Sequence, residues 1–303
     1  MGAQNLPLER SWWIGNIIFA ILYGIELCMF FMSTYLFLNG SRPIKSKYFC
    51  IAFSGTLLIL ITIAMACNLI FCQMMWIEHR DIEGGPVAYF NTNIAAWYNT
   101  LGTAADVAAN ILGDGLMLYR CYVFWSTCYI WVVMFPGLLF LASSTMGIIA
   151  TVQSGLPGGD FFKGTTTNFT TSWLALTITF NVVATSLIIG RLVSVIHNMR
   201  DILSRSRAQV YRGVIVLLVE SALPFTLLGI GYLGTYVCDA PEALAFAGVW
   251  GAFVALSPQA IILHVAMGSV WSKGPAPDDG TVIFPSELGT LSKKEVDSTD
   301  SLP

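Results

Sequence analysis

The chain has 303 residues, of which 55% are hydrophobic and only 11% are charged. Its mean hydropathy is +0.69. A soluble domain carries about 25% charged residues to cover its surface, so this composition excludes most soluble folds and favours a protein embedded in a lipid bilayer. The net charge of −3 argues against nucleic acid as a partner, because domains that bind nucleic acid are normally basic.

Seven apolar segments are each long enough to cross a membrane, for which a helix needs about 20 residues. They lie at residues 12–38, 48–72, 97–124, 129–152, 172–196, 212–238 and 243–270. Runs such as Leu-Leu-Ile-Leu-Ile at 57–61 do not alternate between polar and apolar side chains, as the strands of a membrane barrel would. The sequence therefore predicts an all-α fold, a polytopic bundle of seven transmembrane helices.

Basic residues indicate how this bundle is oriented. With the N-terminus outside, the outer segments hold Arg10, Arg80 and Lys163, and the inner side holds the other twelve Lys and Arg residues. Short cytoplasmic loops retain Lys and Arg, so we expect the N-terminus outside and the C-terminus in the cytoplasm. The first segment is too long for a cleaved signal peptide and is expected to stay as an anchor. The expected location is the plasma membrane.

Residues 1–271 form the predicted transmembrane domain, and the polar residues 272–303 are predicted to be a disordered cytoplasmic tail. The outer segment 73–96 is acidic, the outer segment 153–171 is predicted to be irregular, and both are candidates for an extracellular cap. The inner segment 200–212 carries four Arg residues against one acid. We expect it to contact anionic lipid or a cytoplasmic partner, or to act only as a retention signal for topology.

Two further features concern the outer surface. Cys72 and Cys238 both fall near the outer end of a predicted span, so they are a candidate disulfide in an oxidising compartment. Asn168 begins an Asn-Phe-Thr sequon in an outer loop and is a candidate for glycosylation. A glycan on the Asn39 sequon, in the first inner loop, would overturn the orientation.

The third span concentrates polar side chains. Asp106, Asn110 and Asp114 follow a spacing of four residues, which puts all three on one helix face. Arg120 marks the inner boundary, about 9 Å along the helix from Asp114. A charged side chain in mid-bilayer costs at least about 2.5 kcal/mol, so such residues normally face the bundle interior and have partners or a function.

Other polar residues fall in the inner halves of other spans, and they are Glu26, Glu220, Gln259 and His264. Asp114 is expected to share a layer with Glu26, Glu220 and His264. Acids in one layer tend to be protonated or paired, and Arg120 and Arg191 are the candidate partners. Two interpretations stay open, a structural hydrogen-bond network that fixes helix packing or a site for a ligand, an ion or a proton.

Residues 113–125, Gly-Asp-Gly-Leu-Met-Leu-Tyr-Arg-Cys-Tyr-Val-Phe-Trp, resemble a motif in a family of seven-span membrane proteins from basidiomycete fungi. Glu-Ser-Ala at 220–222 and Ser-Pro at 257–258 extend the resemblance into the sixth and seventh spans. The resemblance implies a multipass membrane protein and no particular activity.

The sequence can be compared with two other classes of seven-helix membrane protein. Retinal is not expected, because all six lysines lie outside the predicted spans and no Schiff base could form there. The segment Tyr119–Tyr122 loosely resembles the Asp-Arg-Tyr motif of G-protein-coupled receptors, but no Asn-Pro-x-x-Tyr motif closes the last span. The similarity to those receptors is therefore one of architecture.

No HExxH, GxSxG or P-loop pattern occurs, so the sequence predicts neither an enzyme nor a cofactor or metal site. The favoured function is a receptor-like sensor whose unknown ligand binds beneath the outer loops. The alternatives are a transporter or lipid-handling protein that uses the buried acids, and a structural or interaction role.

Overall fold

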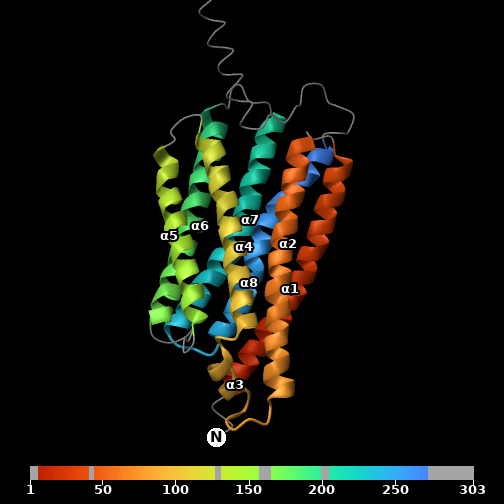
Figure 1. Cartoon of the computed structure of the whole chain (residues 1–303). Coiled ribbons are helices and arrows are strands. Elements are labelled where there is room, and N and C mark those ends of the chain that lie inside the picture. Colours follow the sequence, from red (N-terminus) through yellow and green to blue (C-terminus); the bar gives the residue numbers. More distant parts are fainter. Residues whose placement is uncertain (1–5, 41–43, 127–130, 157–164, 199–204, 272–303) are drawn as a thin grey trace, which may run out of the picture.

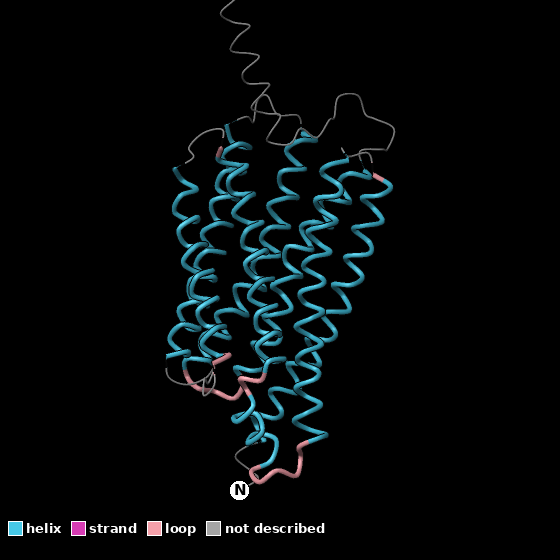
Figure 2. Tube along the Cα trace, in the orientation of Figure 1, coloured by secondary structure: helices cyan, strands magenta, loops and turns pink. Residues whose placement is uncertain are grey.

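The structure, a computed structural model, describes residues 6–40, 44–126, 131–156, 165–198 and 205–271. Its regular elements within these ranges are helices, and Figure 2 draws no strand among them. The predicted all-α fold is confirmed. The predicted tail at 272–303 and residues 200–204 of the basic segment lie outside the described residues.

Long helices form the body of the molecule. They are α1 (Leu6–Asn39), α2 (Ile44–Gln73), α4 (Trp97–Trp125), α5 (Trp131–Ser154), α6 (Thr165–Asn198), α7 (Arg205–Val237) and α8 (Ala243–Trp271). Each holds most of one predicted apolar segment. The helices α6 and α7 begin seven residues earlier than those segments, because hydropathy marks only the apolar part of a helix. The Asn168 sequon therefore lies in the first turns of α6, where Asn168 is exposed, rather than in an irregular loop.

Six of these helices are long and apolar enough to cross a membrane, so the chain is a multipass membrane protein. The 29-residue α4 is not among the six, and it is the helix that carries Asp106, Asp114 and Arg120. It contacts α2, α5, α6 and α8. The helix that carries these polar residues is thus enclosed by other helices on several sides.

The long helices form a closed ring in the order α1, α2, α4, α5, α6, α7, α8 and back to α1 (Figure 1). Helices α4 and α8 also contact each other across this ring. Figure 1 shows that α1 begins at one end of the bundle and α8 finishes at the opposite end. The end at which α1 begins also carries the short helix α3, and we call it the cap end.

Residues 73–96, the acidic outer segment, are largely helical. They form the π-helix η1 (Met74–Glu78) and helix α3 (Gly85–Asn93). Met75 and Phe90 from this segment are buried in a cluster with Phe71 of α2. The turn before α3 uses Gly84 and Gly85 at φ values of 96° and 70°, which favour glycine. Hydropathy missed these elements because they are short and bury only a few side chains.

The first and last long helices meet through small residues. A Cβ atom at Gly15 would lie 3.0 Å from the Cα atom of Ala245, and a Cβ atom at Gly248 would lie 3.1 Å from the Gly15 carbonyl oxygen. The Ser11 hydroxyl oxygen accepts a hydrogen bond of 3.1 Å from the Ala245 N–H. Small residues let helix backbones approach closely in membranes, so this contact closes the ring between α1 and α8.

Three further apolar clusters fill the interior, the smallest of which consists of Phe37, Ile262 and Ala266. The largest one lies toward the cap end and includes Phe19, Trp173 and Trp250. The second includes Met117 and Cys121 of α4, near the opposite end of that helix. Packed apolar side chains therefore fill the bundle at the end opposite the cap.

Candidate functional site

A cavity of about 180 Å³ lies inside the bundle at the cap end. Helices α1, α2, α3, α4 and α8 supply most of its lining, and α6 and α7 each contribute one aromatic side chain. Its aromatic lining residues are Trp12, Phe19, Phe90, Trp173, Tyr232 and Trp250. We call it the cap cavity.

Trp250 of α8 is the centre of the aromatic wall of the cap cavity. Its ring centroid lies 5.7 Å from that of Trp173 on α6 and 5.9 Å from that of Tyr232 on α7. Cβ atoms at Gly147 and Gly229 would lie 2.9 Å and 3.0 Å from the indole nitrogens of Trp173 and Trp250, respectively. Both indole rings therefore pack against glycine residues of neighbouring helices. This packing restricts the positions of the two rings in the aromatic wall.

Asp106 is the acid of the cap cavity. It is half-buried, and its Oδ1 atom is buried without a hydrogen-bond partner. The lining residues, all within the described part of the chain, include no Lys, Arg or His. Among the eight polar candidates from the sequence, Asp106 is the one that lines this cavity. A carboxyl group without a partner is costly in a low-dielectric interior. A bound cation or hydrogen-bond donor would therefore stabilise Asp106.

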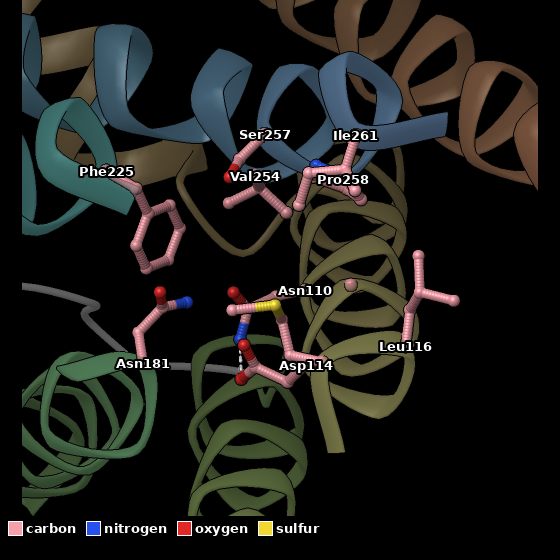
Figure 3. A pocket seen from close by; sticks show the side chains of 11 residues that line it. Asn110, Asp114, Leu116, Asn181, Phe225, Val254, Ser257, Pro258 and Ile261 are labelled. Atoms are coloured by element: carbon pink, nitrogen blue, oxygen red, sulfur yellow. Dashed lines mark hydrogen bonds between the residues drawn. The ribbon is translucent and has the colours of Figure 1, made fainter. Parts of the chain in front are cut away.

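Asn110 and Asp114 of α4 belong to a separate polar cluster, and Figure 3 shows these two side chains. Asn110 Nδ2 donates a 3.3 Å hydrogen bond to Asp114 Oδ2, and both side chains are buried. The same amide lies 3.5 Å from the Thr177 hydroxyl of α6, which shares a 2.7 Å hydrogen bond with Ser143 of α5. The spacing of four residues thus serves a hydrogen-bond network that joins α4, α5 and α6.

A cavity of about 20 Å³ adjoins this network. Asn181 and Ser257 line it beside Asp114, and Figure 3 shows their side chains directed toward the same space. The volume suits a single water molecule, which needs at least about 10–15 Å³ and two or more polar partners. The Asp114 cluster is therefore too tight for an organic ligand.

Val254 separates the two cavities, since it lines both of them. Asp106 and Asp114 lie two turns apart on one face of α4, as predicted, yet each belongs to a different cavity. On the side away from the cap, Met117 and Ile261 line the small cavity and belong to the second apolar cluster. The polar face of α4 is thus interrupted by Val254 and ends at packed apolar side chains.

Glu26 and Gln259 lie away from the Asp114 cluster. Glu26 of α1 is 1% exposed, and neither of its carboxyl oxygens has a hydrogen-bond partner among the described residues. Gln259 Nε2 donates to Ser33 Oγ at 3.3 Å across the α1–α8 contact. Ser33 is two turns from Glu26 on the same face of α1. These residues therefore belong to the packing of α1 against α8.

The residues of the predicted layer, Asp114, Glu26, Glu220 and His264, do not form one buried cluster. Glu220 is exposed on α7 instead of buried beside Asp114, and His264 is half-buried on α8. A count of residues from the end of a helix gives depth in the membrane but not direction around the helix axis. Glu220 therefore shares a depth range with the buried acids without sharing their environment.

Neither predicted basic partner meets Asp114. Arg120 is six residues along the helix, about 240° around its axis, and interacts electrostatically with Cys50 of α2. Arg191 donates a 3.3 Å hydrogen bond from Nε to the Phe124 carbonyl oxygen and lies 5.8 Å from the Trp125 ring centroid. The described hydrogen bond to the Asp114 carboxyl group comes from Asn110 instead.

The predicted disulfide between Cys72 and Cys238 does not form, and both residues are free cysteines. Helices α2 and α7 do not contact each other within the described ranges, so Cys72 and the residue that follows α7 lie on separate parts of the ring. Cys72 Sγ instead lies 3.1 Å from Trp12 Nε1 and 3.3 Å from Asn16 Nδ2, both of which donate to it. The position of both cysteines near the outer end of a predicted span was not enough to predict a disulfide between them.

Several residues of the two cavities and of the Asn110 hydrogen-bond network were not identified from the sequence. Asn181 and Thr177 are polar residues inside an apolar segment, and the reasoning applied to α4 would have identified them. Trp173, Tyr232 and Trp250 carried no such signal, because aromatic residues are common throughout this chain. Only the packing of α6, α7 and α8 brings them together.

Comparisons with known proteins give no match: no family model matches the chain, and no curated protein matches it. The chemistry of the cap cavity and of the Asp114 cluster therefore carries the functional interpretation.

Proposed function

We propose that the protein is a receptor-like sensor of the plasma membrane that binds a small ligand in the cap cavity. The observation that carries this proposal is a cavity of about 180 Å³ with an unpartnered acid and an aromatic wall at one end of the bundle. Cavities that bind small molecules are typically lined by aromatic and apolar side chains with a few convergent polar groups. The apolar cluster around Met117 fills the bundle at the opposite end. This arrangement favours ligand binding in the cap cavity over transport of a substrate through the bundle.

The proposal includes a topology of seven spans with the N-terminus outside. Helix α4 supports it as the seventh span, because it has the length of a span and its polar residues face other helices. The excess of basic residues on one side supports the orientation, which would expose the cap cavity to the exterior. Membership of the seven-span family that residues 113–125 resemble is part of the same proposal.

Helix α8 offers a route from ligand to response. Trp250 and Gly251 line the cap cavity, and Ser257 and Pro258 line the small cavity beside Asp114. The Ser257 hydroxyl donates a 3.0 Å hydrogen bond to the Ser221 carbonyl oxygen of α7. Pro258 cannot continue the backbone ladder, so the helix is locally weakened between its contacts with the two cavities. A ligand that prefers one arrangement of α8 would shift the protein toward that arrangement.

A transporter is the second candidate, because Asp106, Asn110 and Asp114 share one face of α4 and Val254 borders both cavities. A substrate or proton would have to pass Val254 and then the apolar cluster around Met117. Transport therefore requires a larger rearrangement of this bundle than binding does.

The proposed function is tested with a substitution that fills the cap cavity. Gly251 lines it, and a Cβ atom there would meet no heavy atom within 4 Å, so the side chain of Gly251→Leu is expected to extend into the cavity. Gly234→Leu is the matched control, because Gly234 is exposed near the same end of α7 with open space around it. The melting temperature of the purified chain is measured against a panel of pheromones, lipids and metabolites.

We expect a panel compound to raise the melting temperature of the wild type and of Gly234→Leu but not of Gly251→Leu. A compound that stabilises all three proteins equally would place its site elsewhere and contradict the proposal. Accumulation of that compound in proteoliposomes, lost in Asp114→Asn, would favour the transporter instead.

A further inference from the structure

We infer that the ligand of the cap cavity is a small organic cation, an amine or a quaternary ammonium compound, whose positive charge is held by Asp106 beside the aromatic wall. This inference rests on the proposed function and names the chemical class of its ligand.

The first argument is charge. Asp106 is the one Asp or Glu among the cavity-lining residues, and no Lys, Arg or His accompanies it there. A cation beside the carboxylate would replace the water that the group loses on burial, and the low dielectric of the bundle strengthens the attraction. A neutral ligand would leave the carboxylate without a counter-charge, and an anion would be repelled by it.

The second argument is that no donor of the lining serves Asp106. The Trp173 and Trp250 indole N–H groups are buried without an acceptor among the described residues, and three polar side chains donate elsewhere. Asn99 Nδ2 donates a 2.6 Å hydrogen bond to the Ile94 carbonyl oxygen, and the Thr103 hydroxyl donates one of 3.1 Å to the Asn99 carbonyl oxygen. Asn16 Nδ2 donates to the Trp12 carbonyl oxygen and to Cys72 Sγ. These three polar side chains line the cavity, yet their donors serve other acceptors. The Asp106 Oδ1 atom is correspondingly left without a donor.

The third argument is the aromatic wall. A cation is attracted to the face of an aromatic ring within about 6 Å of its centroid, and tryptophan is the strongest of the aromatic side chains in this respect. The centroids of Trp173 and Tyr232 lie 5.7 Å and 5.9 Å from that of Trp250, so one ammonium group has several rings within reach. Asp106 lines the same cavity as Tyr232 and Trp250, and it is close enough to Tyr232 to interact with it electrostatically. An acid beside clustered aromatic rings matches the chemistry of an organic ammonium group.

The test compares cations with neutral molecules of the same shape on the purified full chain. Choline is paired with 3,3-dimethylbutan-1-ol, its uncharged carbon isostere, and 2-phenylethylamine is paired with 2-phenylethanol. We expect at least one cation to bind, measured as a saturable rise in melting temperature, and its neutral partner to bind at least about 10-fold more weakly. Asp106→Asn preserves the shape of the side chain and should lower affinity for the cation by about 10- to 100-fold.

Gly251→Leu should abolish binding of the cation, and Gly234→Leu should preserve it. If Asp106→Asn does not fold, the comparison of cation with neutral isostere on the wild type still decides the inference. Equal binding of a neutral isostere, or a cation that binds Asp106→Asn as well as wild type, would overturn the cation while leaving a ligand in the cap cavity intact. Binding that survives Gly251→Leu would overturn both proposals. No response to either cation at millimolar concentration would overturn the inference alone, since the broader panel tests the cavity separately.

Discussion

Gly113 of α4 lies directly against the backbone of α8 at Val254. A Cβ atom at Gly113 would lie 3.4 Å from the Val254 carbonyl oxygen and 3.7 Å from Pro258 Cγ. Because Pro258 has no N–H, that carbonyl oxygen lacks the donor that a regular helix would supply. The glycine lets α4 approach the interrupted turn of α8, and it places Asp114, the next residue, beside the small cavity.

This contact predicts a size limit at position 113. Gly113→Ala should leave stability close to wild type, because its Cβ atom would make ordinary van der Waals contact. Gly113→Leu should destabilise the protein by about 1–3 kcal/mol through overpacking between α4 and α8. Gly190→Leu, at an exposed position with open space around it, is the control and should have little effect. Melting temperatures in detergent measure all three, and a Gly113→Leu protein as stable as wild type would refute the close contact.

Asp114 gives a second prediction, which separates packing from switching. Asp114→Asn keeps the shape of the side chain and its capacity to accept a hydrogen bond, so stability should stay near wild type. Asp114→Ala leaves the Asn110 amide without its acceptor and should cost about 1–3 kcal/mol. If the charge also acts in signalling, the Asn variant should fold normally and lose its response to ligand. An Ala variant with wild-type melting temperature and unchanged ligand response would remove both roles.

Glu26 gives a third prediction, because its two carboxyl oxygens are buried without partners. Glu26→Met removes a polar group of similar length and should stabilise the protein by about 1–3 kcal/mol, which is the usual cost of a buried unsatisfied group. Glu26→Gln is the matched comparison and should gain less, since it still buries a polar side chain. Denaturation in detergent measures the order of the three proteins. A lower melting temperature for Glu26→Met than for wild type would show that the carboxyl group is needed.

The orientation gives a fourth prediction through Cys238, which is exposed between α7 and α8 at the cap end. With the N-terminus outside, a membrane-impermeant maleimide should label Cys238 in intact cells. Cys28 is also exposed, but it lies in the middle of α1 and should stay unlabelled, because a thiolate does not form in hydrocarbon. Loss of the label in Cys238→Ser is the control. Labelling of Cys238 only after the membrane is permeabilised would reverse the topology.

The sequence alone predicted the apolar parts of the seven long helices, because length and hydropathy are local properties. It also predicted that Asp106, Asn110 and Asp114 share one face of α4, since helical periodicity fixes relative direction within a helix. The hydrogen bond between Asn110 and Asp114 follows from that spacing.

Only the tertiary structure decided how each helix is rotated about its axis and which helix it meets. Those choices expose Glu220, separate Cys72 from Cys238, and divide the polar face of α4 between two cavities at Val254. They also bring Trp173, Tyr232 and Trp250 together from three different helices. Such contacts depend on side-chain packing between distant segments, where small residues such as Gly113 set how closely two helices approach.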